Sequence, residues 1–134
     1  GVQTCALPIF WRGKLPTPAH WESQLHQAED VLRDGRRFVA VAQGQRDDAA
    51  RFRFALASYL LISTDASSFR YADDATYEQA WLYDEYHTQL GAPVSPRYQQ
   101  GGLWRRDFEC GRVTVDPAAH AGSIVRIAVL GCPD

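Results

Sequence analysis

The chain has 134 residues, of which 46% are hydrophobic and 22% are charged, and its formal net charge is −2 at pH 7. This length suits one domain or part of one, and the composition excludes a disordered or collagen-like chain. A nucleic-acid-binding surface needs clustered Lys and Arg, which a slight excess of acidic residues does not favour. No apolar stretch reaches the roughly 20 residues that cross a bilayer. We therefore expect a soluble chain with neither a nucleic-acid nor a membrane partner.

The first nine residues differ in kind from the rest of the sequence. The chain begins with Gly1 and contains no Met, although an open reading frame normally begins with one. Residues 1–9 resemble the translation of a sequencing adapter, and we expect them to be foreign to the protein. The native part would then begin near Phe10, and we expect it to be truncated.

Cysteine and histidine spacing predicts neither a metal nor a cofactor. Apart from Cys5, the cysteines are Cys110 and Cys132, and no C-x-x-C, H-x-H or H-E-x-x-H spacing occurs. The motifs G-x-S-x-G, G-x-G-x-x-G and G-x-x-x-x-G-K are also missing from the sequence, which removes the usual signs of a hydrolase nucleophile, a dinucleotide or a phosphate loop. A Cys110–Cys132 disulfide could form in an oxidising compartment, but two cysteines do not identify that compartment.

Helical and extended patterns alternate through the first half of the chain. Thr17 and Pro18 are typical of a helix start, and Gly35 is typical of a helix end. Between them, apolar residues recur at helical spacing. The run 38–42 is apolar without alternation, as in parallel strands that are covered on both faces.

A second helix and a second strand follow in the same order. Asp47 is a candidate N-cap for a helix that places Phe52 on its apolar face and leaves Arg51 in water. Residues 67–71 are then expected to form another short strand. The order helix, strand, helix, strand predicts two parallel strands joined by a right-handed crossover.

The remainder predicts one further helix and a small antiparallel sheet. Residues 72–90 are rich in aromatic and acidic side chains, and Tyr77, Trp81 and Tyr83 fit one helical face. From residue 96 the periodicity falls to two, which predicts a β-hairpin with a turn at Cys110-Gly111. A final strand is expected over residues 124–130.

Three segments between residues 83 and 117 carry a recognisable pattern: Glu85-Tyr86, Leu90-Gly91-x-Pro93, and the run WRRDFECGRVTVDP at residues 104–117. This pattern resembles the C-terminal end of glycoside-hydrolase-like (β/α)8 barrel proteins, in which a Phe-Glu-Asn-Gly turn precedes a Val-x-Val-Asn-Pro strand. The resemblance is looser over residues 37–82. Two positions depart from it, because Cys110 and Asp116 stand where the family has Asn. Cys tolerates positive φ poorly, so the turn is expected to be wider here.

The resemblance implies an α/β fold, namely the C-terminal βα units of a TIM-like barrel followed by a small antiparallel β appendage. Residues 10–95 would be the last βα units, with residues 38–42 as the seventh strand and residues 67–71 as the eighth. Residues 96–134 would form the appendage.

Functional residues of such barrels lie at the carboxyl ends of the strands. Amides and carboxylates at those positions bind sugar hydroxyls, and aromatic rings stack on sugar faces. The residues that would form this carbohydrate-binding rim are Gln43, Gln45, Tyr71, Asp73, Asp74, Trp81 and Tyr83. Four of them also have a structural alternative: the two aspartates as caps or loop residues, and Trp81 and Tyr83 as packing residues. Arg106 is expected to be structural, paired with a carboxylate.

The resemblance implies that the parent protein is a glycoside hydrolase acting on an oligo- or polysaccharide. Hydrolysis needs two carboxylates across the scissile bond, whereas Asp73 and Asp74 are consecutive and point to opposite faces if extended. We therefore expect the catalytic carboxylates to lie upstream and this chain alone to be inactive.

The alternatives are a non-enzymatic α+β domain that binds a carbohydrate or a protein, and a barrel homologue that binds glycans without cleaving them. The sequence leaves open the sugar, the linkage, the stereochemical course, the oligomeric state and the compartment, with secretion and a periplasmic location included.

Overall fold

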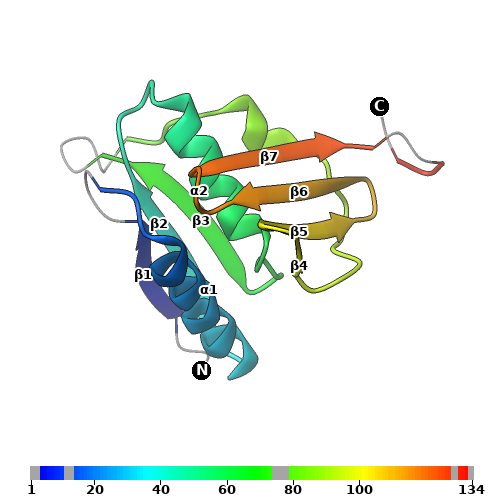
Figure 1. Ribbon diagram of the computed structural model, residues 1–134, viewed down its shortest axis with the longest axis horizontal. Coiled ribbons are helices and arrows are strands. Elements are labelled where there is room, and N and C mark those ends of the chain that lie inside the picture. The colour runs from blue at the N-terminus through cyan, green and yellow to red at the C-terminus, as the bar shows by residue number, and fades with distance from the viewer. Residues whose placement is uncertain (1–3, 11–13, 74–78, 128–129, 133–134) are drawn as a thin grey trace.

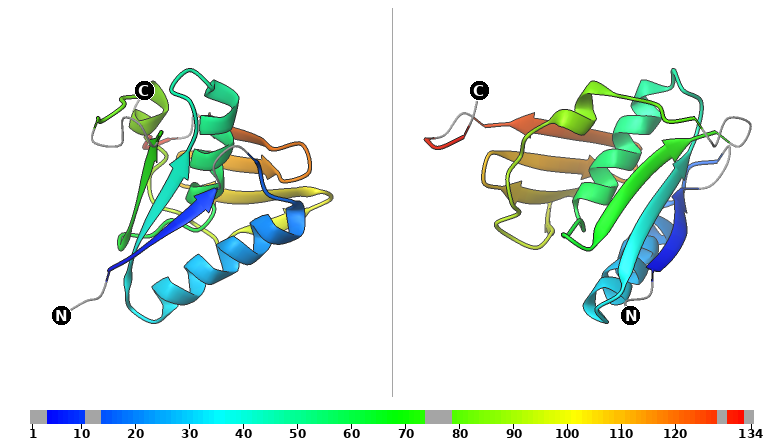
Figure 2. Two further views of the ribbon diagram at one scale, coloured as in Figure 1. Left: turned by 90° about the vertical axis from the view of Figure 1, so that its left-hand side faces the viewer. Right: turned by 180° about the vertical axis from the view of Figure 1, so that it is seen from behind.

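The computed structural model describes the backbone of residues 4–10 and the whole of residues 14–73, 79–127 and 130–132. In these ranges a parallel sheet and an antiparallel sheet enclose a layer of two helices (Figure 1; Figure 2). Neither helix is long and apolar enough to cross a membrane. The elements are β1 (Thr4–Phe10), α1 (Pro18–Arg33), β2 (Arg37–Gln43), α2 (Ala49–Leu60), β3 (Ser67–Ala72), the 3₁₀ turn η1 (Asp84–His87), β4 (Tyr98–Gln100), β5 (Leu103–Phe108), β6 (Gly111–Asp116) and β7 (Ala121–Arg126).

Both predicted helices are confirmed. The Thr17 hydroxyl accepts a hydrogen bond from the His20 backbone N–H at 3.3 Å, with Pro18 in the first turn of α1. Gly35 ends this helix with a φ of 79°, a conformation that suits glycine. The cap of α2 is Asp48 and not Asp47, since the Asp48 carboxylate accepts from the Arg51 N–H at 3.1 Å.

The predicted parallel pairing of β2 and β3 is also confirmed, and β2 lies between β1 and β3. Phe38, Ala40 and Ala42 are buried, whereas Val39 and Val41 are half-buried. The difference arises because both helices lie on one face of this sheet (Figure 2). Coverage of the strand on both faces, expected from its unbroken apolar run, is therefore not what the structure shows.

Strand β1 includes residues 4–9, part of the segment expected to be foreign, and its backbone pairs in parallel with β2. Main-chain hydrogen bonds form irrespective of the source of a sequence. The foreign origin of these residues stays a prediction, which genomic DNA upstream of Phe10 would test.

The antiparallel sheet has the order β4-β5-β6-β7 and contains the predicted hairpin, β5–β6. Val113 and Val115 are fully buried against the helix layer. The last strand covers residues 121–126, so it begins earlier than expected, and residues 128–129 of the expected strand 124–130 lie outside the described ranges. The Cys110–Cys132 disulfide is present, with its Cα atoms 5.7 Å apart, and it ties the chain beyond β7 to the hairpin turn.

The helix expected over residues 72–90 is wrong for the described part of that segment. Residues 74–78, which include Tyr77, lie outside the described ranges, and residues 79–90 contain only the four-residue turn η1. Tyr83 stacks on Phe52 of α2 with 3.9 Å between ring centroids, and Tyr86 meets the same ring edge-on at 5.3 Å. The path of this segment is thus decided by its contacts with α2. The helical spacing of its aromatic residues does not produce a helix.

The prediction of a TIM-like barrel is also wrong. A barrel needs a closed ring of strands, whereas the described parallel sheet is open, with β1 and β3 at its edges. The chain then forms a separate antiparallel sheet, whose strands β6 and β7 pack on α2. Helix α2 is therefore covered on two sides by sheets, an arrangement that the outer helices of a barrel do not have.

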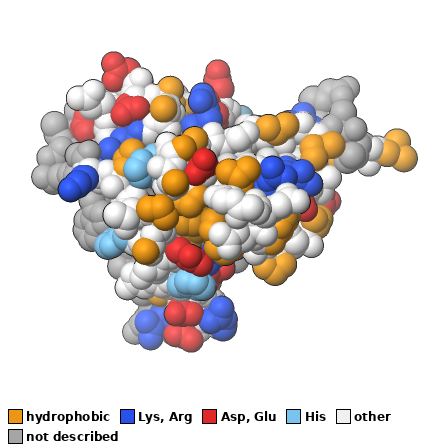
Figure 3. Space-filling view, in the orientation of Figure 1, with side chains coloured by type: hydrophobic (Ala, Val, Ile, Leu, Met, Phe, Trp, Pro, Cys, Tyr) orange, Lys and Arg blue, Asp and Glu red, His pale blue; other side chains and the backbone are white. Residues whose placement is uncertain are grey.

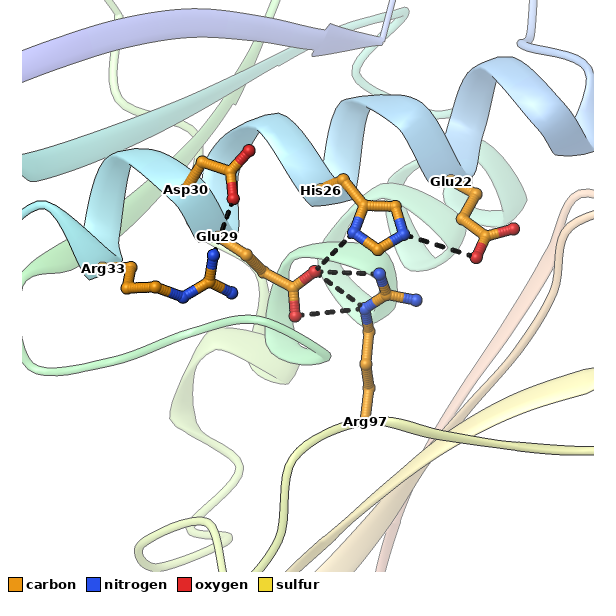
Figure 4. A network of polar contacts seen from close by, with 6 residues as sticks. All are labelled: Glu22, His26, Glu29, Asp30, Arg33 and Arg97. Carbon is orange, nitrogen blue, oxygen red and sulfur yellow. Dashed lines mark hydrogen bonds and ion pairs between the residues drawn. The ribbon is translucent and has the colours of Figure 1, made fainter.

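A partly buried ion pair joins α1 to the start of the antiparallel sheet (Figure 4). The Glu29 carboxylate accepts hydrogen bonds from Arg97 Nη2 at 2.8 Å and from Arg97 Nε at 3.2 Å. Arg97 Nη1 has no acceptor among the described residues, but the guanidinium lies over the Trp104 ring, 4.4 Å from its centroid. The ring face offsets part of the cost of burying this charge. On the face seen in Figure 3, acidic and basic side chains are interspersed.

We expect Gly122→Ala to lower the free energy of unfolding by about 1–3 kcal/mol. A Cβ at Gly122 would lie 2.7 Å from the Arg53 carbonyl oxygen and 3.0 Å from Phe54 Cα, so β7 would have to move away from α2. Urea denaturation measures the change. The control is Gly102→Ala, because a Cβ there meets nothing within 4 Å. Equal stability of both variants would contradict the close packing of β7 on α2.

We expect Glu29→Gln to lower the free energy of unfolding by about 2 kcal/mol, the scale of hydrogen bonds to a charged group. The reason is that the Arg97 side chain is only 5% exposed and would lose its counter-charge. Glu22→Gln is the matched control, since Glu22 is 41% exposed and contacts only the exposed His26 in the same network. A loss no larger than that of the control would contradict a stabilising role for this pair.

Candidate functional site

The carboxyl ends of β2 and β3 lie side by side and bring most of the predicted site residues together. The Gly44 N–H donates to the Ala72 carbonyl oxygen at 3.2 Å, which extends the pairing by one residue. Gln43 is half-buried, Gln45 is exposed, and Asp73 follows β3 half-buried. Asp74 lies outside the described residues. We call the surface formed by residues 43–46 and 71–73 the carboxyl edge.

Three side chains hold the loop of the carboxyl edge through its backbone. The Tyr71 hydroxyl donates to the Gln45 carbonyl oxygen at 2.8 Å, and the Tyr83 hydroxyl donates to that of Arg46 at 2.8 Å. Arg51 Nε donates to the Gln43 carbonyl oxygen at 2.7 Å. Arg51 was expected to lie in water, so this contact is a correction. The consequence is a loop backbone held in place at the carboxyl edge.

The aromatic residues of the site pack on one another. Tyr71 is 2% exposed and Trp81 is 6% exposed, and their rings meet edge to face at 5.8 Å. Tyr83 is half-buried and stacks on Tyr71 at 6.0 Å. Arg46 lies over the Trp81 ring at 6.0 Å. The faces of Tyr71 and Trp81 are therefore largely covered by protein, and Tyr83 is the more accessible ring.

A cavity of about 300 Å³ opens between β3 and the following segment. Its lining combines four aromatic rings with one guanidinium: Phe69, Arg70, Tyr71, Ala80, Trp81 and Tyr86. Arg70 Nη2 donates to the Gln79 carbonyl oxygen at 3.3 Å. The cavity thus offers an apolar floor with a charged group at its rim, at the lower end of the volume usual for small-molecule sites.

The sequence profile of hypothetical glycosyl hydrolase family 15 matches residues 19–112. The chain belongs to this family. A search of curated proteins gives no match. The profile range includes the carboxyl edge, both helices and the turn of the β5–β6 hairpin, and it ends before β7. The resemblance to glycoside-hydrolase-like proteins seen in the sequence is confirmed at this level.

Burial sets the protonation of the tyrosines in this glycosyl-hydrolase-family chain. Burial raises the pKa of Tyr86 to about 12, and it also raises the pKa of Tyr71 and of Tyr83 above the ordinary value. These hydroxyls therefore stay protonated well above neutral pH, and Tyr71 and Tyr83 keep the protons that they donate to carbonyl oxygens.

Among the described residues, no group of three His, Cys, Asp or Glu side chains could hold a metal ion. Sequence reasoning missed Arg46 and Arg51 as parts of the site. Their type gives no signal, because arginines in loops and in first helical turns are usually solvated. Only the fold shows that they contact Trp81 and the Gln43 backbone.

We expect the chain to lose stability as the pH rises above about 10. An unfolded tyrosine has a pKa near 10, whereas Tyr86 in the folded chain has a pKa of about 12. Between these values the unfolded chain releases a proton that the folded chain keeps, so stability is fully present below pH 10 and falls above it. Urea midpoints at pH 8 and pH 11 measure the decline.

In Tyr86→Phe the decline between pH 8 and pH 11 should be smaller than in the unmodified chain. The remainder belongs to Tyr59, Tyr71 and Tyr83, whose pKa values are raised in the same direction. An identical decline in this variant would contradict the role of Tyr86 burial.

Proposed function

We propose that this member of hypothetical glycosyl hydrolase family 15 binds a carbohydrate at its carboxyl edge. The observation that supports this is the convergence of amide and carboxylate side chains at the ends of two adjacent parallel strands, beside an aromatic-lined cavity of about 300 Å³. Ligands of open α/β sheets bind outside the carboxyl ends of the strands. Family membership supplies the ligand class.

In this proposal each group has a distinct part. Gln43, Gln45 and Asp73, with Asp74, bind sugar hydroxyls, because amides and carboxylates offer acceptors and donors in fixed directions. Tyr83, which is half-buried, offers the exposed part of its ring to the apolar side of a sugar. Tyr71 and Trp81 contribute ring edges and hold the loop in place.

We place glycan binding in this chain, and hydrolysis of a glycosidic bond in a larger parent protein. Cleavage requires two carboxylates on either side of the scissile bond, ~5–5.5 or ~6.5–9.5 Å apart. Asp73 and Asp74 are consecutive, which does not suit two groups on opposite sides of one bond. The catalytic carboxylates would come from outside these 134 residues.

Binding of glycans without any hydrolysis is the second candidate function. Hydrolysis needs two carboxylates. Within the described residues of the carboxyl edge, the one carboxylate is that of Asp73, and this observation favours binding alone.

Affinity gel electrophoresis in soluble amylopectin, hydroxyethylcellulose, xylan and galactomannan tests binding at the carboxyl edge. We expect at least one polysaccharide to retard the chain, and Gln45→Ala and Asp73→Asn to weaken this retardation about tenfold each, the effect of losing one good hydrogen bond. Gln99→Ala on β4, an exposed glutamine far from the edge, is the matched control.

The proposal fails if no polysaccharide retards the chain, or if the edge variants behave like the control. A reducing-sugar assay on the same samples separates binding from cleavage, and we expect no sugar release by this chain.

A further inference from the structure

A second and larger cleft, of about 980 Å³, lies at the other end of α2. The first turn of α2 contacts the carboxyl edge through Arg51. The last turn, which contains Leu60, lies about 14 Å further along the helix and forms one wall of this cleft. The other walls are residues 88–93 and the end of β5 with its turn, residues 106–110. We call this space the hairpin cleft.

The family-like segments of the sequence converge on the hairpin cleft. Leu90, Gly91 and Pro93 come from one segment, and Arg106, Phe108 and Glu109 come from the other. These are residues on which the resemblance to glycoside-hydrolase-like proteins rests, yet the carboxyl edge uses none of them. Both segments of the family-like pattern therefore lie at the hairpin cleft.

Backbone pairing holds the two segments together. The Cys110 N–H donates to the Leu90 carbonyl oxygen at 2.7 Å, and the Glu109 N–H donates to that of Ala92 at 2.9 Å. Glu109 Oε1 in turn accepts from the Ala92 N–H at 3.2 Å. Gly91 has a φ of +74°, and a Cβ there would lie 2.9 Å from Glu109 Cβ. Glycine is therefore required where the segment passes Glu109.

Arg106 holds the wall formed by the end of β5 against the end of α2, and its guanidinium is used for hydrogen bonds to carbonyl oxygens. Its Nη1 donates to the carbonyl oxygens of Leu60 at 3.0 Å and Ser63 at 2.8 Å, and its Nε donates to that of Ser95 at 3.0 Å. The guanidinium thus satisfies the free carbonyls at the end of α2. The prediction that Arg106 pairs with a carboxylate is wrong, whereas the prediction that it has a structural role is confirmed. The cleft is accordingly formed by elements that are tied to one another.

The groups around the hairpin cleft suit a neutral sugar ring. Asp65 and Glu109 supply carboxylates and Thr88 supplies a hydroxyl, while Leu90, Pro93 and Phe108 supply apolar surface. A sugar ring presents hydroxyls at its rim and C–H groups on its faces, and it pairs with this mixture of groups. An acidic sugar would meet two carboxylates and an arginine already bonded to carbonyl oxygens.

We propose that the hairpin cleft is a second carbohydrate subsite, which takes a neutral sugar ring and is separate from the carboxyl edge. The ligand class rests on the proposed function, whereas the location rests on the lining of the cleft. Asp65 and Glu109 bind ring hydroxyls, and the exposed apolar surface of Pro93 contacts the ring face, with a small contribution from Leu90 and Phe108, which are 6% and 7% exposed.

Chemical-shift mapping on the ¹⁵N-labelled chain tests this subsite. The probes are maltohexaose, cellohexaose, xylohexaose and mannohexaose at concentrations up to 10 mM. We expect at least one to shift the amides of residues 88–91 and 109–110 in a saturable way. Asp65→Asn and Thr88→Val should weaken the titration about tenfold each, whereas the controls Asp34→Asn and Thr114→Val, which lie outside the cleft, should not.

The result separates the two proposals. Shifts confined to residues 43–46 and 71–73 would overturn the hairpin subsite and leave the carboxyl edge standing. Shifts confined to the cleft would support the subsite and count against the edge. Shifts in neither region with any of the four probes, or equal titrations for Asp65→Asn and Asp34→Asn, would overturn the subsite.

Discussion

The fold depends on the burial of α2 between two sheets. Seven of its twelve residues are buried, which is far more than the single apolar stripe of a helix with one covered side. One face packs on β2 and β3, and another packs on β6 and β7. Gly122 allows the close approach of β7, since its missing side chain leaves room for the α2 backbone. The second sheet is therefore an integral layer of the fold.

The two ends of α2 each organise one candidate carbohydrate site. At its start, Arg51 and Phe52 hold the loop and the rings of the carboxyl edge. At its end, the Leu60 carbonyl oxygen accepts from Arg106, which fixes the hairpin cleft. A displacement of α2 would consequently alter both sites, so variants that loosen this helix are poor probes of either one.

Several polar groups within the interior make directed contacts. The Trp21 indole N–H donates to the Ser58 hydroxyl at 2.9 Å, and Ser58 donates to the Phe54 carbonyl oxygen at 2.7 Å. Arg97 has Glu29 and the Trp104 ring, and Arg106 has three carbonyl oxygens. An unpaired buried polar group costs more than the paired group gains. These contacts therefore fix how the helices sit against the antiparallel sheet more than they add to stability.

The sequence by itself determined the local elements: the cap at Thr17, the end of a helix at Gly35, the parallel pairing of β2 with β3 and the β5–β6 hairpin. The cap, the helix end and the hairpin follow from signals within a few residues, the parallel pairing follows from the order of helices and strands, and the family pattern at residues 83–117 was visible in the sequence itself. Only the tertiary structure decided that the sheets stay open and enclose α2, and that residues 79–90 pack on it without forming an α-helix. It also decided that Tyr71 and Tyr83 donate to carbonyl oxygens 26 and 37 residues away. Such contacts depend on how layers stack, and neither periodicity nor composition encodes that stacking.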